Sequence, residues 1–179
     1  MNPDRCAPSD PTPTVHKLML DTNVVDELLD DSHLVKYIIA AVESGNVQLF
    51  VTHVQADEIG RMTGEKATKR EALLGVLTEV PASSVPTAGI VIGHSRFDQT
   101  MFGSDHNAEL FHVLKGGNSK HIEDAQIVLT AAWLYADIVS NDKRVVNTLA
   151  PEVGINAYRT SELREFLCQW CPRDDGPSF

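Results

Sequence analysis

Short apolar runs of strand length alternate along this chain with longer amphipathic stretches, and this alternation constrains the fold more than any other feature. Residues 17–20 form an apolar run that ends at Asp21, and residues 138–140 form a similar run. Residues 34–42 place apolar side chains at the three- and four-residue spacing of an amphipathic helix. Apolar strands that alternate with helices predict an α/β fold, with a central parallel sheet flanked by helices on both faces.

The same signals predict the order of the elements. Predicted strands are residues 17–20, 47–52, 138–140 and, at a sheet edge, 155–158. Predicted helices are residues 24–29, 34–42, 54–62, 72–80, 110–114, 122–135, a short helix after residue 142, and a last helix from residue 160 or 161 to residue 167. Prolines break the chain at residues 81–86, and residues 93–105 show no clear period, so no regular element is expected there.

Composition sets the expected domain boundaries. Residues 1–14 are polar and proline-rich and predict a disordered arm, and residues 171–179 predict a flexible tail. Residues 15–170 between them have the length of one domain. No apolar run is long enough to span a membrane, and no apolar block follows the start of the chain as in a signal peptide. We therefore expect a soluble, cytoplasmic, single-domain protein.

Four carboxylates occupy positions that a parallel sheet would bring together. Asp21 directly follows the first predicted strand, and Asp142 follows the strand at residues 138–140. We expect Glu58 early in the helix after the second strand and Asp124 in the first turn of the helix from residue 122. Because sites in open α/β sheets form beyond the carboxyl ends of the strands, these side chains are expected to face one crevice.

Carboxylates that share a crevice repel each other. At about 4 Å, two unit charges cost roughly 1 kcal/mol in water and about 4 kcal/mol at an effective dielectric of 20. A hard divalent cation that prefers oxygen ligands, such as Mg²⁺ or Mn²⁺, would relieve this repulsion. Such an ion also activates water and stabilises charge at a phosphate, so the pattern predicts metal-assisted phosphodiester hydrolysis. Chance proximity is the alternative, because the chain has 25 acidic residues.

Four local sequences resemble, in the same order, the acidic segments of the PIN-domain ribonuclease family, which includes VapC-like toxins. The first reads Leu-Met-Leu-Asp-Thr-Asn-Val-Val at residues 18–25, and the second reads Ala-Asp-Glu-Ile at residues 56–59. The third reads Glu-Asp-Ala-Gln-Ile at residues 123–127, followed by Thr-Ala-Ala at residues 130–132. The fourth reads Ile-Val-Ser-Asn-Asp at residues 138–142. The resemblance extends from residue 16 to about residue 167 and is specific as a set.

The resemblance implies a metal-dependent endoribonuclease with RNA as its substrate. It implies that the catalytic residues and ligands of Mg²⁺ or Mn²⁺, directly or through water, are Asp21, Glu58, Asp124 and Asp142. It also implies polar support of those carboxylates by Thr22, Asn23 and Ser140, of which Thr22 or Asn23 is alternatively a helix cap. Many members of the family are toxins inhibited by a small partner. An antitoxin partner and a homodimer therefore follow from the resemblance, although residues 81–105 are longer than a compact toxin needs.

Two of the four acids have an acidic neighbour, Asp57 beside Glu58 and Glu123 beside Asp124. Side chains one residue apart on a helix diverge by about 100 degrees, so both members of a pair rarely face one ion. The family pattern selects Glu58 and Asp124.

Other polar residues near these segments have two interpretations each. His121 could be a general acid, but a surface or packing role is favoured, and Asp26 is expected on a solvated helix face. A basic cluster follows Glu58 and could bind RNA phosphates or form a solvated helix face: Arg61, Lys66, Lys69 and Arg70.

Two other functions compete with the nuclease. The net charge of −10 argues against a simple nucleic-acid-binding protein and favours an inactive PIN-like module that binds other proteins. A haloacid dehalogenase type of phosphatase also begins with an aspartate at a strand end. That family needs a second aspartate two residues later, where this chain has Asn23. No P-loop and no dinucleotide-binding glycine pattern is present in the sequence.

Overall fold

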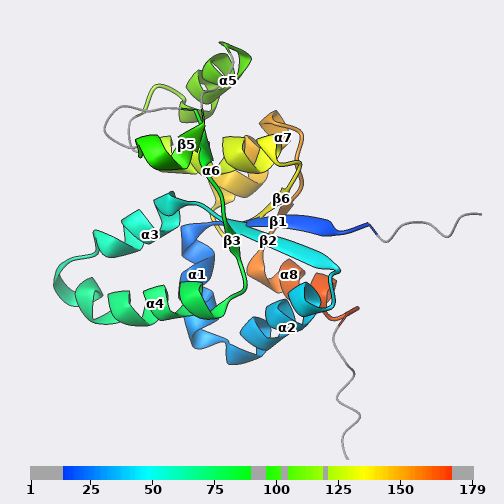
Figure 1. Cartoon of the computed structure of the whole chain (residues 1–179). Helices are drawn as coiled ribbons and strands as arrows, with labels where there is room; N and C mark the ends of the chain where they lie inside the picture. Colours follow the sequence, from blue (N-terminus) through cyan, green and yellow to red (C-terminus); the bar gives the residue numbers. More distant parts are fainter. Residues whose placement is uncertain (1–13, 90–95, 102–104, 119–120, 171–179) are drawn as a thin grey trace, which may run out of the picture.

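A five-stranded parallel sheet forms the centre of the molecule (Figure 1). The computed structural model describes residues 14–89, 96–101, 105–118 and 121–170. The strand order is β3-β2-β1-β6-β7, and every neighbouring pair is parallel. The strands are β1 (His16–Leu20), β2 (Val47–Val51), β3 (Ser83–Ser84), β6 (Asp137–Val139) and β7 (Ala157–Tyr158). The predicted α/β fold with a central parallel sheet is confirmed.

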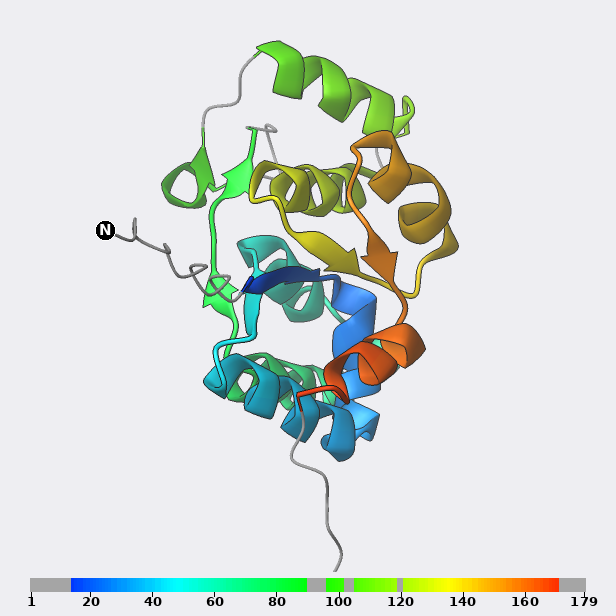
Figure 2. The ribbon, with the colours of Figure 1, turned by 90° about the vertical axis from the view of Figure 1, so that its right-hand side faces the viewer.

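Helices cover both faces of this sheet (Figures 1 and 2). They are α1 (Thr22–Asp30), α2 (Ser32–Glu43), α3 (His53–Gly60), α4 (Ala67–Glu79), α5 (Asp105–Lys115), α6 (Ile122–Trp133), α7 (Ala150–Glu152) and α8 (Thr160–Leu167). Helices α1, α2, α4 and α8 lie on one side of the sheet, and α5, α6 and α7 lie on the other (Figure 1). In the described part of the chain, none of the helices has the length and apolar character needed to cross a membrane.

The central strand β1 shows why the strands are apolar throughout. Leu18 and Leu20 pack into the cluster formed with α1, α2, α4 and α8. Met19, between them in sequence, packs on the opposite face against α6 and α7. Successive side chains of a strand point to opposite faces, so a strand covered on both sides needs apolar residues at every position. All three residues are at most 1% exposed.

The described residues between 81 and 101 contain three very short strands, two of which fall in the stretches predicted to lack regular elements. β3 pairs in parallel with β2 at the edge of the main sheet. β4 (Thr87–Ala88) and β5 (Thr100–Met101) form a separate parallel pair. The prediction of no regular element was therefore wrong, because a strand of two residues is too short to show an alternating pattern. The apolar run at residues 90–92, the arm before residue 14 and the tail after residue 170 lie outside the described residues.

The strand order places a crevice beside β1. From β1 the chain moves outward to β2 and β3, and it then returns to the other side of β1 through β6 and β7. This reversal makes the carboxyl ends of β1 and β6 the topological switch point, where open α/β sheets bind ligands. Leu20 is the register partner of Val139, so Asp21 and Ser140 follow the two strands side by side.

Gln55 joins helix α3 to the end of β1. Its Oε1 accepts hydrogen bonds from the backbone N–H of Thr52 at 2.9 Å and from the hydroxyl of Thr52 at 2.7 Å. Its Nε2 donates to the carbonyl oxygen of Leu20 at 2.6 Å. Gln55 is fully buried, so these bonds replace water for groups that solvent does not reach. The Thr-x-x-Gln sequence forms a capping box at the start of α3.

We predict that Gln55→Met lowers the free energy of unfolding by about 2–4 kcal/mol. Methionine has a similar size but leaves the Leu20 carbonyl and the Thr52 N–H buried without partners. Urea denaturation measures the effect. Gln48→Met is the matched control because Gln48 is exposed on β2. Equal stabilities of the two variants would show that the Gln55 contacts contribute nothing.

Candidate active site

A cavity of about 580 Å³ lies beside the carboxyl end of β1. Its walls come from α1, α3, the segment after α3, α4 and the first turn of α6. Five acidic side chains line it: Asp21, Asp26, Glu58, Glu123 and Asp124. Two basic side chains, Arg61 and Lys66, line it as well. The structure thus brings three of the four predicted carboxylates, Asp21, Glu58 and Asp124, to one cavity.

Asp21 is the most buried of these acids, at 4% exposure. Its Oδ2 accepts hydrogen bonds from Asn23 Nδ2 and Ser140 Oγ, both at 2.6 Å, and its Oδ1 accepts from the N–H of Thr22 at 2.7 Å. Each carboxylate oxygen has two lone pairs, so Oδ1 retains one for a further ligand. Burial raises the pKa of Asp21 to about 6, the Ser140 hydrogen bond opposes this shift, and the charge of Asp124 adds to it.

Glu58 faces Asp21 from the last turn of α3. The Thr22 hydroxyl donates a hydrogen bond to Glu58 Oε2. Burial raises the pKa of Glu58 to about 8, and the Thr22 bond opposes the shift, while Glu123 and the charge of Asp21 add to it. The expectation that Glu58 lies early in its helix was wrong. Gln55 holds the start of α3 against β1, and Glu58 lies one turn later on the same face of the helix.

Asp124 and Glu123 both reach the cavity from the first turn of α6. Asp124 Oδ2 lies 3.1 Å from Arg144 Nη1 and 3.8 Å from His121 Nδ1, and Glu123 pairs with Arg61. Burial raises the pKa of Asp124, Arg144 opposes the shift, and the charge of Asp142 adds to it. The sequence argument chose between the two neighbours. That choice was too narrow, because the end of a helix can direct adjacent side chains toward one space.

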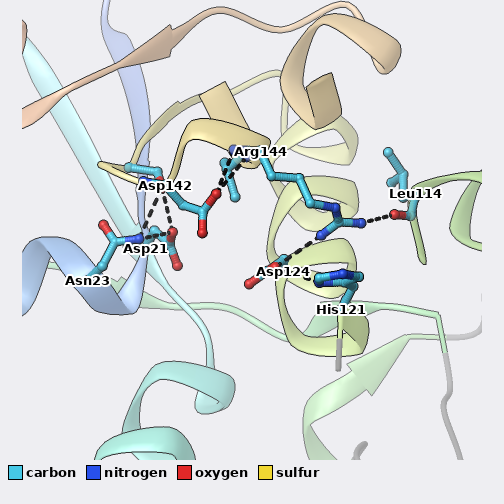
Figure 3. A network of polar contacts seen from close by, with 9 residues as sticks. Asp21, Asn23, Leu114, His121, Asp124, Asp142 and Arg144 are labelled. Carbon is cyan, nitrogen blue, oxygen red and sulfur yellow. Dashed lines mark hydrogen bonds and ion pairs between the residues drawn. The ribbon is translucent and has the colours of Figure 1, made fainter. Parts of the chain in front are cut away.

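Asp142 lies beside the cavity and is not one of the residues that line it. Its Oδ1 accepts hydrogen bonds from the N–H of Arg144 at 2.6 Å and of Val145 at 3.4 Å, which begins the π-helical turn Val145–Leu149. Figure 3 shows its carboxylate between those of Asp21 and Asp124. Asp142 thus contacts the backbone N–H of Arg144 and adds its charge beside Asp124, and its role as a metal ligand stays a prediction.

The predicted supporting residues connect the ends of β1 and β6. Asn23 Nδ2 donates to Asp21 and, at 3.2 Å, to Ser140 Oγ, and Asn23 Oδ1 accepts from the N–H of Asn141 at 2.9 Å. Thr22 supplies its N–H to Asp21 and its hydroxyl to Glu58. Ser140 is fully buried and donates to Asp21. All three residues thus orient a carboxylate directly.

The basic cluster after Glu58 divides into two groups. Arg61 and Lys66 line the cavity. Lys69 turns to α1, where its Nζ lies 3.3 Å from Asp26 Oδ1 and 4.0 Å from Asp30 Oδ2. Asp26, expected on a solvated face, is half exposed at the rim of the cavity. Arg70 is not among the residues that line the cavity.

Two nearby residues lie outside the cavity. Asp57 points away from Glu58 and pairs with Arg96, as the divergence of neighbouring side chains predicts. His121 contacts Asp124 from the residue before α6 and does not line the cavity.

Sequence reasoning missed Gln55 and Arg144, which contact residues of the site, and it set Glu123 aside in favour of Asp124. The Thr-x-x-Gln pattern at residues 52–55 is a signal that could have identified Gln55. Glu123 could have been retained with Asp124, since both fall in a predicted first turn. Arg144 reaches Asp124 only through the tertiary fold, and the sequence holds no local signal for it.

The donor set has the chemistry that Mg²⁺ and Mn²⁺ require. It consists of carboxylate oxygens, and burial is the main cause of the raised pKa values of Asp21, Glu58 and Asp124. Within residues 14–89, 96–101, 105–118 and 121–170, no three His, Cys, Asp or Glu side chains are close enough to hold a metal as they stand. Arg144 holds Asp124, and Thr22 holds Glu58. The residues fit such an ion in kind, and their side chains would have to move closer together to hold it.

Comparison with known proteins agrees with this fold. No protein-family model matches the chain, and neither does any curated protein. The solved structure of PAE2754 from Pyrobaculum aerophilum is similar over 89% of this chain and 99% of its own, with 13% identity and a TM-score of 0.52. VapBC-1 from nontypeable Haemophilus influenzae is similar over 81% of this chain and 98% of its own, with 15% identity and a TM-score of 0.49.

A third similar structure is the PilT N-terminus domain protein SSO1118 from Sulfolobus solfataricus P2. It covers 88% of this chain and 98% of its own, with 14% identity and a TM-score of 0.44. At these sequence identities the similarities concern the fold alone. The shared fold is inferred from the comparison with PAE2754. The chain thus shares its fold with PAE2754, and the resemblance to the PIN-domain family rests on the four acidic segments of the sequence.

We predict that Glu58→Gln stabilises the protein at about pH 8 when divalent cations are absent. The folded state holds the proton of Glu58 more tightly than the unfolded chain, whose pKa is near 4.5. The resulting stability is fully present below that value and is lost as the pH rises through about 8. Thermal melts in EDTA should show a melting temperature roughly 3 °C above wild type at about pH 8 and little difference at about pH 4.

Glu71→Gln, on the exposed surface of α4, is the control for this measurement. A Glu58→Gln variant that follows the wild-type pH dependence would contradict the described burial of Glu58.

Proposed function

We propose that the chain is a metal-dependent endoribonuclease that hydrolyses RNA phosphodiester bonds at this cavity. The observation that carries the proposal is the set of three carboxylates, Asp21, Glu58 and Asp124, that share one cavity at the switch point of the sheet. Their pKa values are all raised, chiefly by burial. Perturbed titratable groups that converge in a cleft favour a functional site over chance proximity.

The free lone pair on Asp21 Oδ1 and the carboxylates of Glu58 and Asp124 would hold Mg²⁺ or Mn²⁺, with Glu123 beside them. The bound ion would lower the pKa of a water molecule and stabilise the negative charge that develops on the phosphate. Asn23 and Ser140 hold Asp21 in one orientation by hydrogen bonds to Oδ2, and Oδ1 keeps a lone pair for the ion. Preorganised carboxylates of this kind need little rearrangement during the reaction.

The chain also supplies cationic groups for the RNA backbone. Arg61 and Lys66 line the same cavity as the carboxylates, so phosphates beside the scissile bond can contact them. Lys66 supplies local attraction on a chain whose net charge of −10 repels RNA, whereas Arg61 is paired with Glu123 and contributes less. Lys69 is paired with Asp26 and Asp30 and contributes less to this attraction.

The family resemblance extends the proposal to a protein partner. We propose that a small antitoxin protein covers the cavity and inhibits cleavage. We also propose that the active assembly is a homodimer. An acidic cavity favours a partner that inserts a basic side chain. The product of the gene immediately upstream is the first candidate, and its coexpression should suppress the toxicity of this chain.

We predict that wild-type protein cleaves RNA only with Mg²⁺ or Mn²⁺ and that Asp21→Asn lowers the rate by at least about a hundredfold. The substitution keeps the shape of the side chain and removes the charge that the metal needs. The rate at which each protein cleaves a fluorescent single-stranded RNA measures this effect. Asp30→Asn, on the exposed end of α1, should retain wild-type activity.

A wild-type protein that binds its partner but leaves RNA intact with both metals would contradict the nuclease. That result would favour the inactive PIN-like interaction module, which the acidic net charge also supports.

We predict that Lys66→Ala raises KM about fivefold and leaves kcat nearly unchanged, because a phosphate contact outside the reacting bond contributes equally to ground and transition states. The slope of affinity against salt concentration should also fall by about one unit. Steady-state kinetics at several salt concentrations measure both. Lys36→Ala on α2, exposed and distant from the cavity in sequence and fold, is the matched control. An unchanged KM for Lys66→Ala would remove this residue from the RNA-binding surface.

A further inference from the structure

Arg144 connects three parts of the molecule at the edge of the site. Its backbone N–H donates to Asp142 Oδ1 at 2.6 Å, and its Nη1 donates to Asp124 Oδ2 at 3.1 Å. Its Nη2 donates to the carbonyl oxygen of Leu114, near the end of α5. Figure 3 shows the guanidinium group between Asp124 and Leu114. The Arg144 side chain is 26% exposed, so water only partly screens these contacts.

This placement gives Arg144 the position of a counter-ion. Asp124 is one of the carboxylates that would hold a metal, and its Oδ2 is already occupied by a group that keeps its charge at all physiological pH values. As the described side chains stand, no three metal-binding groups are close enough to share an ion. The contact with Arg144 occupies Asp124 Oδ2, on the side of this carboxylate that faces the guanidinium group (Figure 3).

We propose that Arg144 is an internal counter-ion that competes with the divalent metal for Asp124, so that metal binding separates Arg144 from Asp124. The proposal rests on the proposed metal-dependent function. Arg144 is a positioning residue in this scheme, and it acts through Asp124. In the metal-free protein it relieves the repulsion among the carboxylates, and this relief must be given up when the ion enters.

The contact with Leu114 extends the consequence to α5. One guanidinium group holds both Asp124 of α6 and a carbonyl in the last turn of α5, so movement of Arg144 affects both contacts. Basic side chains that bind the last carbonyls of a helix stabilise its end. Metal binding should therefore loosen the end of α5, which does not itself line the cavity.

The test compares Mn²⁺ affinity in wild-type protein, Arg144→Gln and Lys143→Gln by titration calorimetry and by the electron paramagnetic resonance signal of free Mn²⁺. Lys143 is exposed and adjacent, so its variant removes the same charge without removing a contact to Asp124. Arg144→Gln should tighten Mn²⁺ binding roughly fivefold. Lys143→Gln should change it by less than about twofold. Arg144→Lys retains the charge and should stay close to wild type.

Each outcome separates this proposal from the proposed function. Binding to Arg144→Gln that is no tighter than to Lys143→Gln, with clear binding to wild type, overturns the competition and leaves the metal site intact. Binding to Arg144→Gln alone supports the competition, because wild-type Arg144 then excludes the ion. Absence of binding to all variants overturns both proposals.

Hydrogen exchange provides a second measurement, and circular dichroism verifies that each variant is folded. In wild-type protein, Mn²⁺ should increase amide exchange at the end of α5, near Leu114. In Arg144→Gln, exchange there should be fast already without Mn²⁺ and should not change on addition. Protection of this segment by Mn²⁺ in wild type would contradict the release of Leu114.

Discussion

The site depends on the burial of one carboxylate, Asp21, at the end of the central strand. Three neutral donors hold it, namely the N–H of Thr22, the amide of Asn23 and the hydroxyl of Ser140. None of them supplies a positive charge, so burial raises the pKa of Asp21 to about 6. Two of these donors follow Asp21 directly in sequence, and the third comes from the neighbouring strand β6. The pairing of β1 with β6 therefore positions this carboxylate.

The distribution of charge around the cavity contributes to the raised pKa values of its acidic side chains. Arg61 pairs with Glu123 and Arg144 pairs with Asp124, so these two arginines are directed to the α6 side of the cavity. Asp21 and Glu58 face each other through Thr22, and the charge of Asp21 adds to the raised pKa of Glu58. A cation at this point would satisfy the pair of carboxylates that the arginines do not reach. Because positive charge is unevenly distributed around the cavity, an added cation is attracted most strongly to the position between Asp21 and Glu58.

Much of the fold could be predicted from the sequence, and part of the site could not. The apolar strands and amphipathic helices follow from patterns within single segments, as the run from Leu18 to Leu20 shows. Asp21 could be placed because the carboxyl ends of parallel strands meet at one edge. The two-residue strand β3 shows no alternating pattern in the sequence, because only its pairing with β2 defines it. Arg144 acquires its contacts only when β6, α5 and α6 come together, which no local pattern records.

The parts of the site come from distant stretches of the chain, and this separation has a consequence for synthesis. Ser140 and Asp21 are 119 residues apart in sequence and meet only when β6 pairs with β1. A ribosome releases the N-terminal half first, so Asp21 and Glu58 leave the exit tunnel long before their partners. Until α6 and β6 have emerged, a nascent chain lacks the helix that carries Asp124 and the hydroxyl that orients Asp21. The site therefore remains incomplete during synthesis of the first three quarters of these residues.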